Sequence, residues 1–165
     1  MSDRETMNDL YATLANTARG DLGREAAVDL LYRHARWLPT LYAWGWLTDL
    51  SQDEYLGDDQ DGYAPEPWIV IQWTAIAATL DTGVTRSMPE HEHALLVGTD
   101  SERSVLRIAC SLAADSPTGL RSSLSGLDRV NLRLVLHAIV HATQGEMQAH
   151  RAFPLNRPAT SKEPA

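Results

Sequence analysis

The sequence contains a single cysteine, Cys110, and a single lysine, Lys162, among its 165 residues. One cysteine cannot form an internal disulfide, which excludes the small secreted scaffolds that depend on disulfides, and the cysteine-based ligand sets of zinc fingers are missing as well. No apolar run reaches the roughly 18 residues that a membrane span requires. The polar start at residues 1–5 is unlike a signal peptide. We therefore expect a soluble, cytoplasmic protein with no membrane partner.

The sequence also lacks the short motifs that mark common catalytic and cofactor sites. It has no glycine-rich phosphate loop, no nucleophile elbow and no pair of carboxylates at a recognisable catalytic spacing. Cys110 has no histidine or lysine beside it, so the pattern predicts an unreactive buried thiol. These absences favour a protein that is not an enzyme and that holds no cofactor.

Signals for the starts of helices are frequent. In a capping box, a Ser or Thr side chain accepts from the third helical N–H group, and a Glu three residues later reaches back. Apolar residues then recur at intervals of three and four, as on one face of a helix. The capping-box pattern occurs at Ser2–Glu5, Ser51–Glu54, Ser87–Glu90 and Thr99–Glu102. The predicted helices cover residues 3–18, 22–38, 40–49, 68–80, 88–97, 100–114 and 126–143.

Two of these segments are more apolar than the others. Residues 68–80 could form a buried strand by composition, but a run of this length without a break favours a buried helix. The segment 126–143 is apolar on most sides, which is typical of the central helix of a bundle. We therefore predict an all-α fold, a compact bundle of six to seven helices around the C-terminal helix at 126–143.

The length of the chain is that of about one domain. We predict a single helical domain over residues 1–150, with an acidic loop at 49–66. After Gly145 the sequence becomes polar and rich in proline, so residues 151–165 are predicted to be a flexible tail.

The net charge of −8 is concentrated in residues 49–66, which carry seven carboxylates and no basic residue. Such a run is stable when it is well solvated or when a cationic partner matches it. Aromatic residues, which anchor many protein interfaces, are interleaved with the acids. We therefore predict a non-catalytic interaction or regulatory protein, a homodimer, whose acidic-aromatic segment 49–68 contacts a protein with a basic surface. The predicted partner-binding residues are Asp53, Glu54, Tyr55, Asp58, Asp59, Asp61, Tyr63 and Trp68.

His137 and His141 suggest a second function, a metal-dependent enzyme. Their spacing of four places both imidazoles on one helix face, as metal sites on helices require. The intervening residues supply no carboxylate, however, so the same pattern also fits two hydrogen-bonded histidines in a helix seam.

A third function is a DNA-binding regulator. Residues 101–142 have the outline of a helix-turn-helix unit, with a short helix after Pro117. Nucleic-acid binding draws much of its affinity from a basic surface, and this region carries no excess of basic residues. Nucleic acid is therefore not the partner that we expect. The residues available for DNA contacts would be Arg121, Arg129, Asn131 and Arg133.

Overall fold

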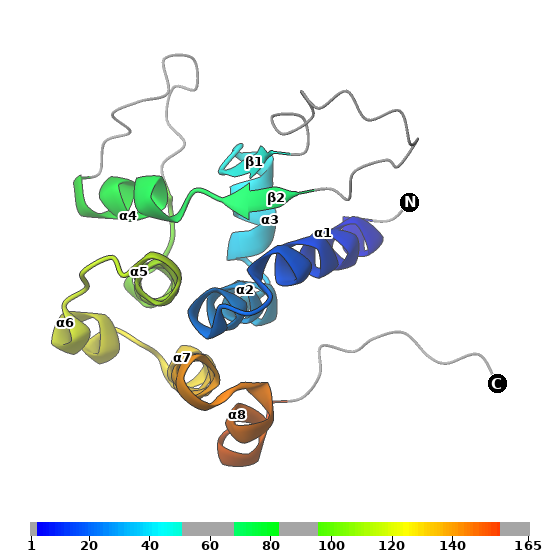
Figure 1. Ribbon diagram of the computed structural model, residues 1–165. Helices are drawn as coiled ribbons and strands as arrows, with labels where there is room; N and C mark the ends of the chain where they lie inside the picture. The colour runs from blue at the N-terminus through cyan, green and yellow to red at the C-terminus, as the bar shows by residue number, and fades with distance from the viewer. Residues whose placement is uncertain (1–2, 51–67, 83–95, 156–165) are drawn as a thin grey trace, which may run out of the picture.

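The fold is known from a computed structural model, which describes residues 3–50, 68–82 and 96–155 (Figure 1). The described part is mostly helical, which confirms the predicted all-α class, and it adds one short two-stranded ladder. None of its helices is long and apolar enough to cross a membrane. The elements are α1 (Asp3–Ala18), α2 (Leu22–His34), α3 (Trp37–Ala43), β1 (Leu47–Asp49), β2 (Ile69–Ile71), α4 (Trp73–Thr82), α5 (Asp100–Ala114), α6 (Leu120–Ser125), α7 (Arg129–Gln144) and α8 (Glu146–Ala152).

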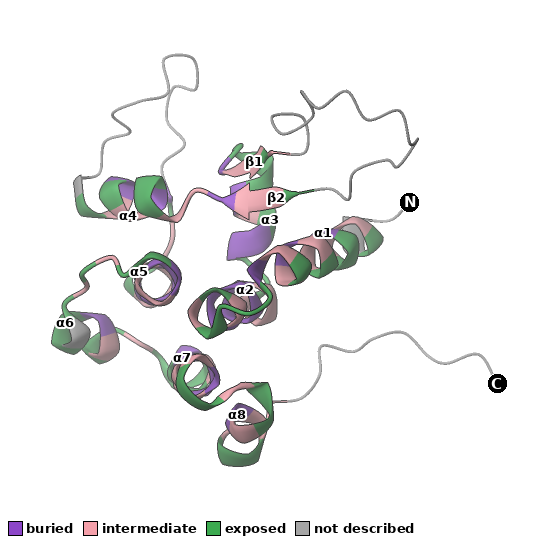
Figure 2. Cartoon of the chain, in the orientation of Figure 1, coloured by how far each residue is buried: buried purple, intermediate pink, exposed green. Residues whose placement is uncertain are grey.

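Helix α2 occupies the centre of the fold, where it packs against α1, α3, α5 and α7 (Figures 1 and 2). Its residues from Ala26 to Leu31 are all buried, so the helix has no exposed side over this stretch. A Cβ atom on Gly23 would lie 2.3 Å from the carbonyl oxygen of Leu112, so α2 and α5 can approach this closely only because residue 23 is glycine.

The prediction that the helix at 126–143 forms the centre is not what the structure shows. Helix α7 packs against α2, α5 and α8 and leaves Val130 71% and Leu132 37% exposed in its first turn. Part of the apolar surface of α7 is therefore not covered by neighbouring helices.

The break between α2 and α3 lies at Ala35, whereas the predicted helices over 22–38 and 40–49 place it at Pro39. Ala35 adopts a left-handed conformation with φ of 60°, and its N–H donates to the carbonyl of Tyr32, which ends α2. Pro39 then lies in the first turn of α3. Backbone N–H groups in this turn make no hydrogen bond within the helix, so proline is tolerated there. The predicted helix over 40–49 is consequently wrong at its C-terminal end, where residues 47–49 form β1.

The ladder of β1 and β2 is the largest difference from the predicted elements. Leu47 pairs with Ile71, Thr48 with Val70 and Asp49 with Ile69 in an antiparallel register. The helix predicted over residues 68–80 is therefore wrong at its start and correct from Trp73 onwards. The β-branched residues of β2 favour a strand once β1 provides a partner, and that partner lies some 20 residues earlier in the chain.

Other helix starts agree with the sequence. Thr99 and Glu102 form the predicted capping box of α5, with both reciprocal hydrogen bonds present. Asp128 caps α7 by accepting from the N–H groups of Val130 and Asn131. Helix α8 was not predicted, and it includes the first two residues of the expected tail. The helix expected at 88–97, apart from its last two residues, and the tail from residue 156 lie outside the described residues.

Candidate functional site

The acidic-aromatic segment 49–68 begins and ends at the β ladder. The backbone N–H of Leu50 donates a hydrogen bond of 2.8 Å to the carbonyl oxygen of Trp68, directly beyond the pairing of Asp49 with Ile69. Of the predicted partner-binding residues, the structure describes only Trp68, whose side chain is 52% exposed. The other seven, from Asp53 to Tyr63, lie outside the described residues. The two ends of the segment are therefore fixed beside each other at one place on the molecule.

Further hydrogen bonds hold the opposite end of the ladder, where β1 begins and β2 ends. The N–H of Gln72 donates to the carbonyl of Trp46 at 3.0 Å, and the side-chain amide of Gln72 donates to the hydroxyl of Thr48 at 2.8 Å. Trp46 is 2% exposed and belongs to the main hydrophobic core. The ladder from which the acidic segment starts is thus attached to the hydrophobic core through Trp46.

The two histidines of the alternative metal site lie on one face of α7, as their spacing predicts; this face is turned to α2, and both side chains are buried. His137 is 1% exposed and His141 is 5% exposed. The Nδ1 atom of His137 lies 3.8 Å from Oδ2 of Asp29, and Nε2 of His141 lies 3.8 Å from Oε2 of Glu25. Both carboxylates belong to α2, so the seam between α2 and α7 is polar at this level.

Asp29 is engaged by Arg33, one helical turn later. The Nε atom of Arg33 lies 2.8 Å and 2.7 Å from the two carboxylate oxygens of Asp29, and both side chains are at least nine-tenths buried. The hydroxyl of Tyr11 donates to Oδ1 of Asp29 at 3.4 Å. Burial and then the nearby carboxylate of Asp29 raise the pKa of Tyr11 to about 12. A buried ion pair with an added hydroxyl donor therefore faces the histidines.

The environment of His137 favours the neutral form of its imidazole. Burial lowers the pKa of His137, and the positive charge of Arg33 and the neighbouring imidazoles act in the same direction against Asp29. His150 from α8 packs edge-on against His137, with ring centroids 5.0 Å apart, and its Nε2 atom lies 3.6 Å from Glu146. The cluster joins α2, α7 and α8.

The geometry of the cluster does not favour the metal-enzyme alternative. Both oxygens of Asp29 already accept from Arg33, and a metal ion would have to compete with that buried pair. Within the described residues, no group of three or more His, Cys, Asp or Glu side chains is placed to hold a metal ion. The Nε2 atom of His137 and the Nδ1 atom of His141 are buried and have no hydrogen-bond partner. The cluster is a polar contact among α2, α7 and α8.

The order of helices agrees with the helix-turn-helix alternative, but not all of the predicted DNA-contacting residues are available for binding. Helices α5, α6 and α7 follow each other as expected. Asn131, however, is buried, and its side-chain amide donates to Ser101 and Asp128. Arg133 is exposed but donates to the carbonyl of Pro154. Two of the four predicted DNA contacts, Asn131 and Arg133, therefore already make hydrogen bonds within the fold, whereas the three arginines are all exposed.

Comparison of the chain with protein-family models, with curated proteins and with solved structures finds no match.

Proposed function

We propose that the protein is a non-catalytic interaction protein of regulatory kind that acts in the cytoplasm. Its acidic-aromatic segment 49–68 binds a partner protein with a basic surface. The observation that carries the proposal is the hydrogen bond between Leu50 and Trp68, which brings together the two ends of the most acidic stretch of the chain.

The charge of this segment supports a basic partner. Between Leu50 and Trp68 the sequence has six carboxylates and no basic residue, and Asp49 adds a seventh at the base. Like charges gathered in one region repel each other and attract a complementary surface, which speeds association and selects against acidic partners. The charge is therefore expected to determine which partner is recognised.

The anchoring of the segment supports a defined binding location. A chain of this length whose ends are joined can extend at most about 30 Å from its base, because an extended residue spans about 3.3–3.6 Å. Trp68 lies at that base with about half of its side chain exposed. Tryptophan is enriched among the residues that contribute most to interface affinity. A partner that contacts the carboxylates can thus also contact Trp68.

The proposal is tested with two variants that have the same net charge. Three carboxylates are removed inside the segment in one variant and outside it in the other. In the first variant, Asp58, Asp59 and Asp61 are changed to Asn. In the control, Asp9, Asp81 and Asp115, which lie outside the segment, are changed to Asn; both variants move the net charge from −8 to −5. Binding of a fluorescently labelled oligo-arginine peptide is measured by anisotropy, with a glutamine peptide of equal length as the reference.

We expect the segment variant to bind the arginine peptide several-fold more weakly than the control variant. The affinity of the unmodified protein should also fall as salt is added, since exposed charges are screened within about 10 Å at 0.1 M salt. Equal losses in the two variants would mean that general acidity, and not the segment, attracts the peptide. That result, or equal binding of the glutamine peptide, would contradict the proposal.

We further propose that the chain forms a homodimer through the N-terminal end of α7. Val130 is 71% exposed in the first turn of this helix, and exposed apolar surface is commonly covered in an assembly. Light scattering with size-exclusion chromatography tests this point. A dimer that the Val130→Asp variant converts to a monomer is expected, and a monomeric unmodified protein would contradict it.

A further inference from the structure

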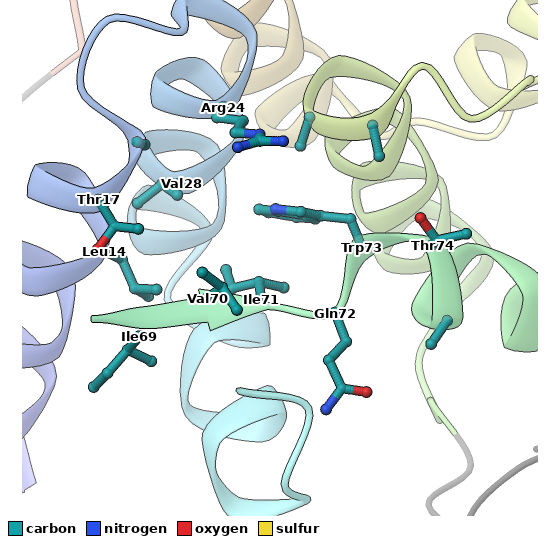
Figure 3. Close-up of a pocket in the computed structure, with 14 residues that line it drawn as sticks. Leu14, Thr17, Arg24, Val28, Ile69, Val70, Ile71, Gln72, Trp73 and Thr74 are labelled. Carbon is teal, nitrogen blue, oxygen red and sulfur yellow. The ribbon is translucent and has the colours of Figure 1, made fainter. Parts of the chain in front are cut away.

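A groove of about 490 Å³ lies between the N-terminal helices and the strand that follows the acidic segment (Figure 3). Helices α1 and α2 form one wall, the continuous stretch from β2 into α4 forms the other, and the end of α5 contributes Ala113 and Ala114. Its volume is within the range of small-molecule sites in proteins, which is about 300–1,000 Å³. Nothing in the proposed partner binding uses this groove.

The lining of the groove is mostly apolar, with one charged side chain. Leu14, Val28 and Ile71 supply aliphatic surface, and Trp73 supplies an aromatic ring. In Figure 3 the indole of Trp73 lies between Arg24 and strand β2, whereas Gln72 points away from the groove. Arg24 is the single charged residue of the lining, and no Asp or Glu side chain takes part in it.

Arg24 is available to a ligand. Its side chain is 57% exposed, and its Nε atom lies 3.4 Å from Oδ2 of Asp21, which is itself 52% exposed. An exposed pair of this kind is weak, because water solvates both partners. The planar guanidinium has further N–H groups that match the two oxygens of a carboxylate.

We infer that this groove binds a small aromatic carboxylate, whose ring lies against the indole of Trp73 and whose carboxylate pairs with Arg24. The apolar lining takes up the ring, and stacked or edge-on contacts with an indole favour an aromatic body over a polar one. A cationic ligand would meet Arg24 without any carboxylate of the lining to balance its charge. The groove therefore discriminates by charge as well as by shape.

The test uses 2-naphthylacetate as the probe and its neutral amide as the matched comparison, with binding to the full chain measured by isothermal titration calorimetry. The acid should bind about tenfold more tightly than the amide, since the charge-assisted pair with Arg24 is made only by the acid. The Arg24→Gln variant should bind both compounds with the affinity of the amide. The control variant Arg129→Gln, on the exposed surface of α7, should keep the preference for the acid.

A second variant tests the location of the site without touching its charge. Ala75 and Ala114 line the groove and are exposed, so the double variant Ala75→Leu, Ala114→Leu narrows the groove with little effect on folding. This double variant should lose binding of the acid, while its circular dichroism spectrum stays that of the unmodified protein. Equal affinity for acid and amide, no binding of the acid at millimolar concentration, or an Arg24→Gln variant that keeps the preference would overturn the inference.

Discussion

The N–H of Leu50 and the carbonyl of Trp68 are joined by a hydrogen bond of 2.8 Å, although 17 residues separate them in the sequence. This bond extends the β1–β2 ladder by one step, and at its other end the ladder continues to Trp46 and Gln72. The most acidic stretch of the chain is therefore attached at both ends to the β1–β2 ladder. The proposed function depends on this attachment, because an anchored segment presents its charge at one place.

Removing the donor of this bond is expected to weaken partner binding. In the Leu50→Pro variant, residue 50 has no N–H group, so the bond to Trp68 cannot form. We expect a loss of about 1 kcal/mol in the free energy of unfolding, together with a several-fold lower affinity for the oligo-arginine peptide. Chemical denaturation and anisotropy measure the two effects. The Leu50→Ala variant keeps the N–H group and should keep the affinity; a weaker affinity in both variants would show that the side chain matters and the bond does not.

The buried pair of Asp29 and Arg33 is expected to be far more important for stability than the exposed pair of Asp21 and Arg24. Changing Asp29 to Asn leaves the guanidinium of Arg33 buried without its carboxylate, which costs about 3–5 kcal/mol. Changing Asp21 to Asn keeps a capping side chain and removes only an exposed pair, which costs at most about 1 kcal/mol. Urea unfolding followed by tryptophan fluorescence measures both. Similar losses in the two variants would contradict the burial of the Asp29–Arg33 pair.

Stability is expected to fall as the pH is lowered below about 6.5, the ordinary pKa of histidine. His137 and His34 both have pKa values lowered by burial in the folded state, so in this range the unfolded chain binds more protons than the folded protein. The stability is therefore complete above the unfolded pKa and is lost as the pH falls from there towards the lower folded pKa.

The His137→Gln variant should have a weaker dependence of its unfolding free energy on pH over this window. A variant with His34 and His137 both changed to Gln should have a weaker dependence still. Urea midpoints measured between about pH 5 and 7.5 test the prediction. An unchanged slope in both variants would show that other groups cause the pH dependence.

The thiol of Cys110 is expected to be unreactive in the folded protein. The side chain is fully buried in α5, and burial raises its pKa to about 12, so the reactive thiolate is nearly absent at neutral pH. A thiol-specific disulfide reagent should modify one group per chain in denaturant and almost none without it. Rapid modification of the folded protein would contradict the burial of Cys110 and the packing of α5.

The sequence predicted the elements whose signals are local. The capping box at Thr99 and Glu102 marks the start of α5 because both hydrogen bonds are made within one turn. The spacing of His137 and His141 correctly predicts that both lie on one face of their helix, and that face is turned to α2. These features depend on residues three or four positions apart, and a single sequence contains that information.

The features that were missed depend on pairing between distant segments. The strand at Ile69–Ile71 is stabilised by β1, and no local pattern identifies that partner. The carboxylates opposite the histidines belong to α2, where an Asp29–Arg33 spacing of four reads as an ordinary surface pair. The signal that could have found them is the spacing of four that Glu25 and Asp29 share with the two histidines, since two polar pairs with equal spacing fit one helix seam.

The measurement that tests the proposed function most directly is the mapping of the peptide contact by NMR. The protein is labelled with ¹⁵N, its backbone is assigned, and the oligo-arginine peptide is added in steps while the amide resonances are followed. The proposal predicts that the shifts concentrate in residues 51–68 and their neighbours in β1 and β2, and that α7 and α8 are unaffected. Shifts that concentrate on α7, α8 or another surface, with residues 51–68 unchanged, would contradict it.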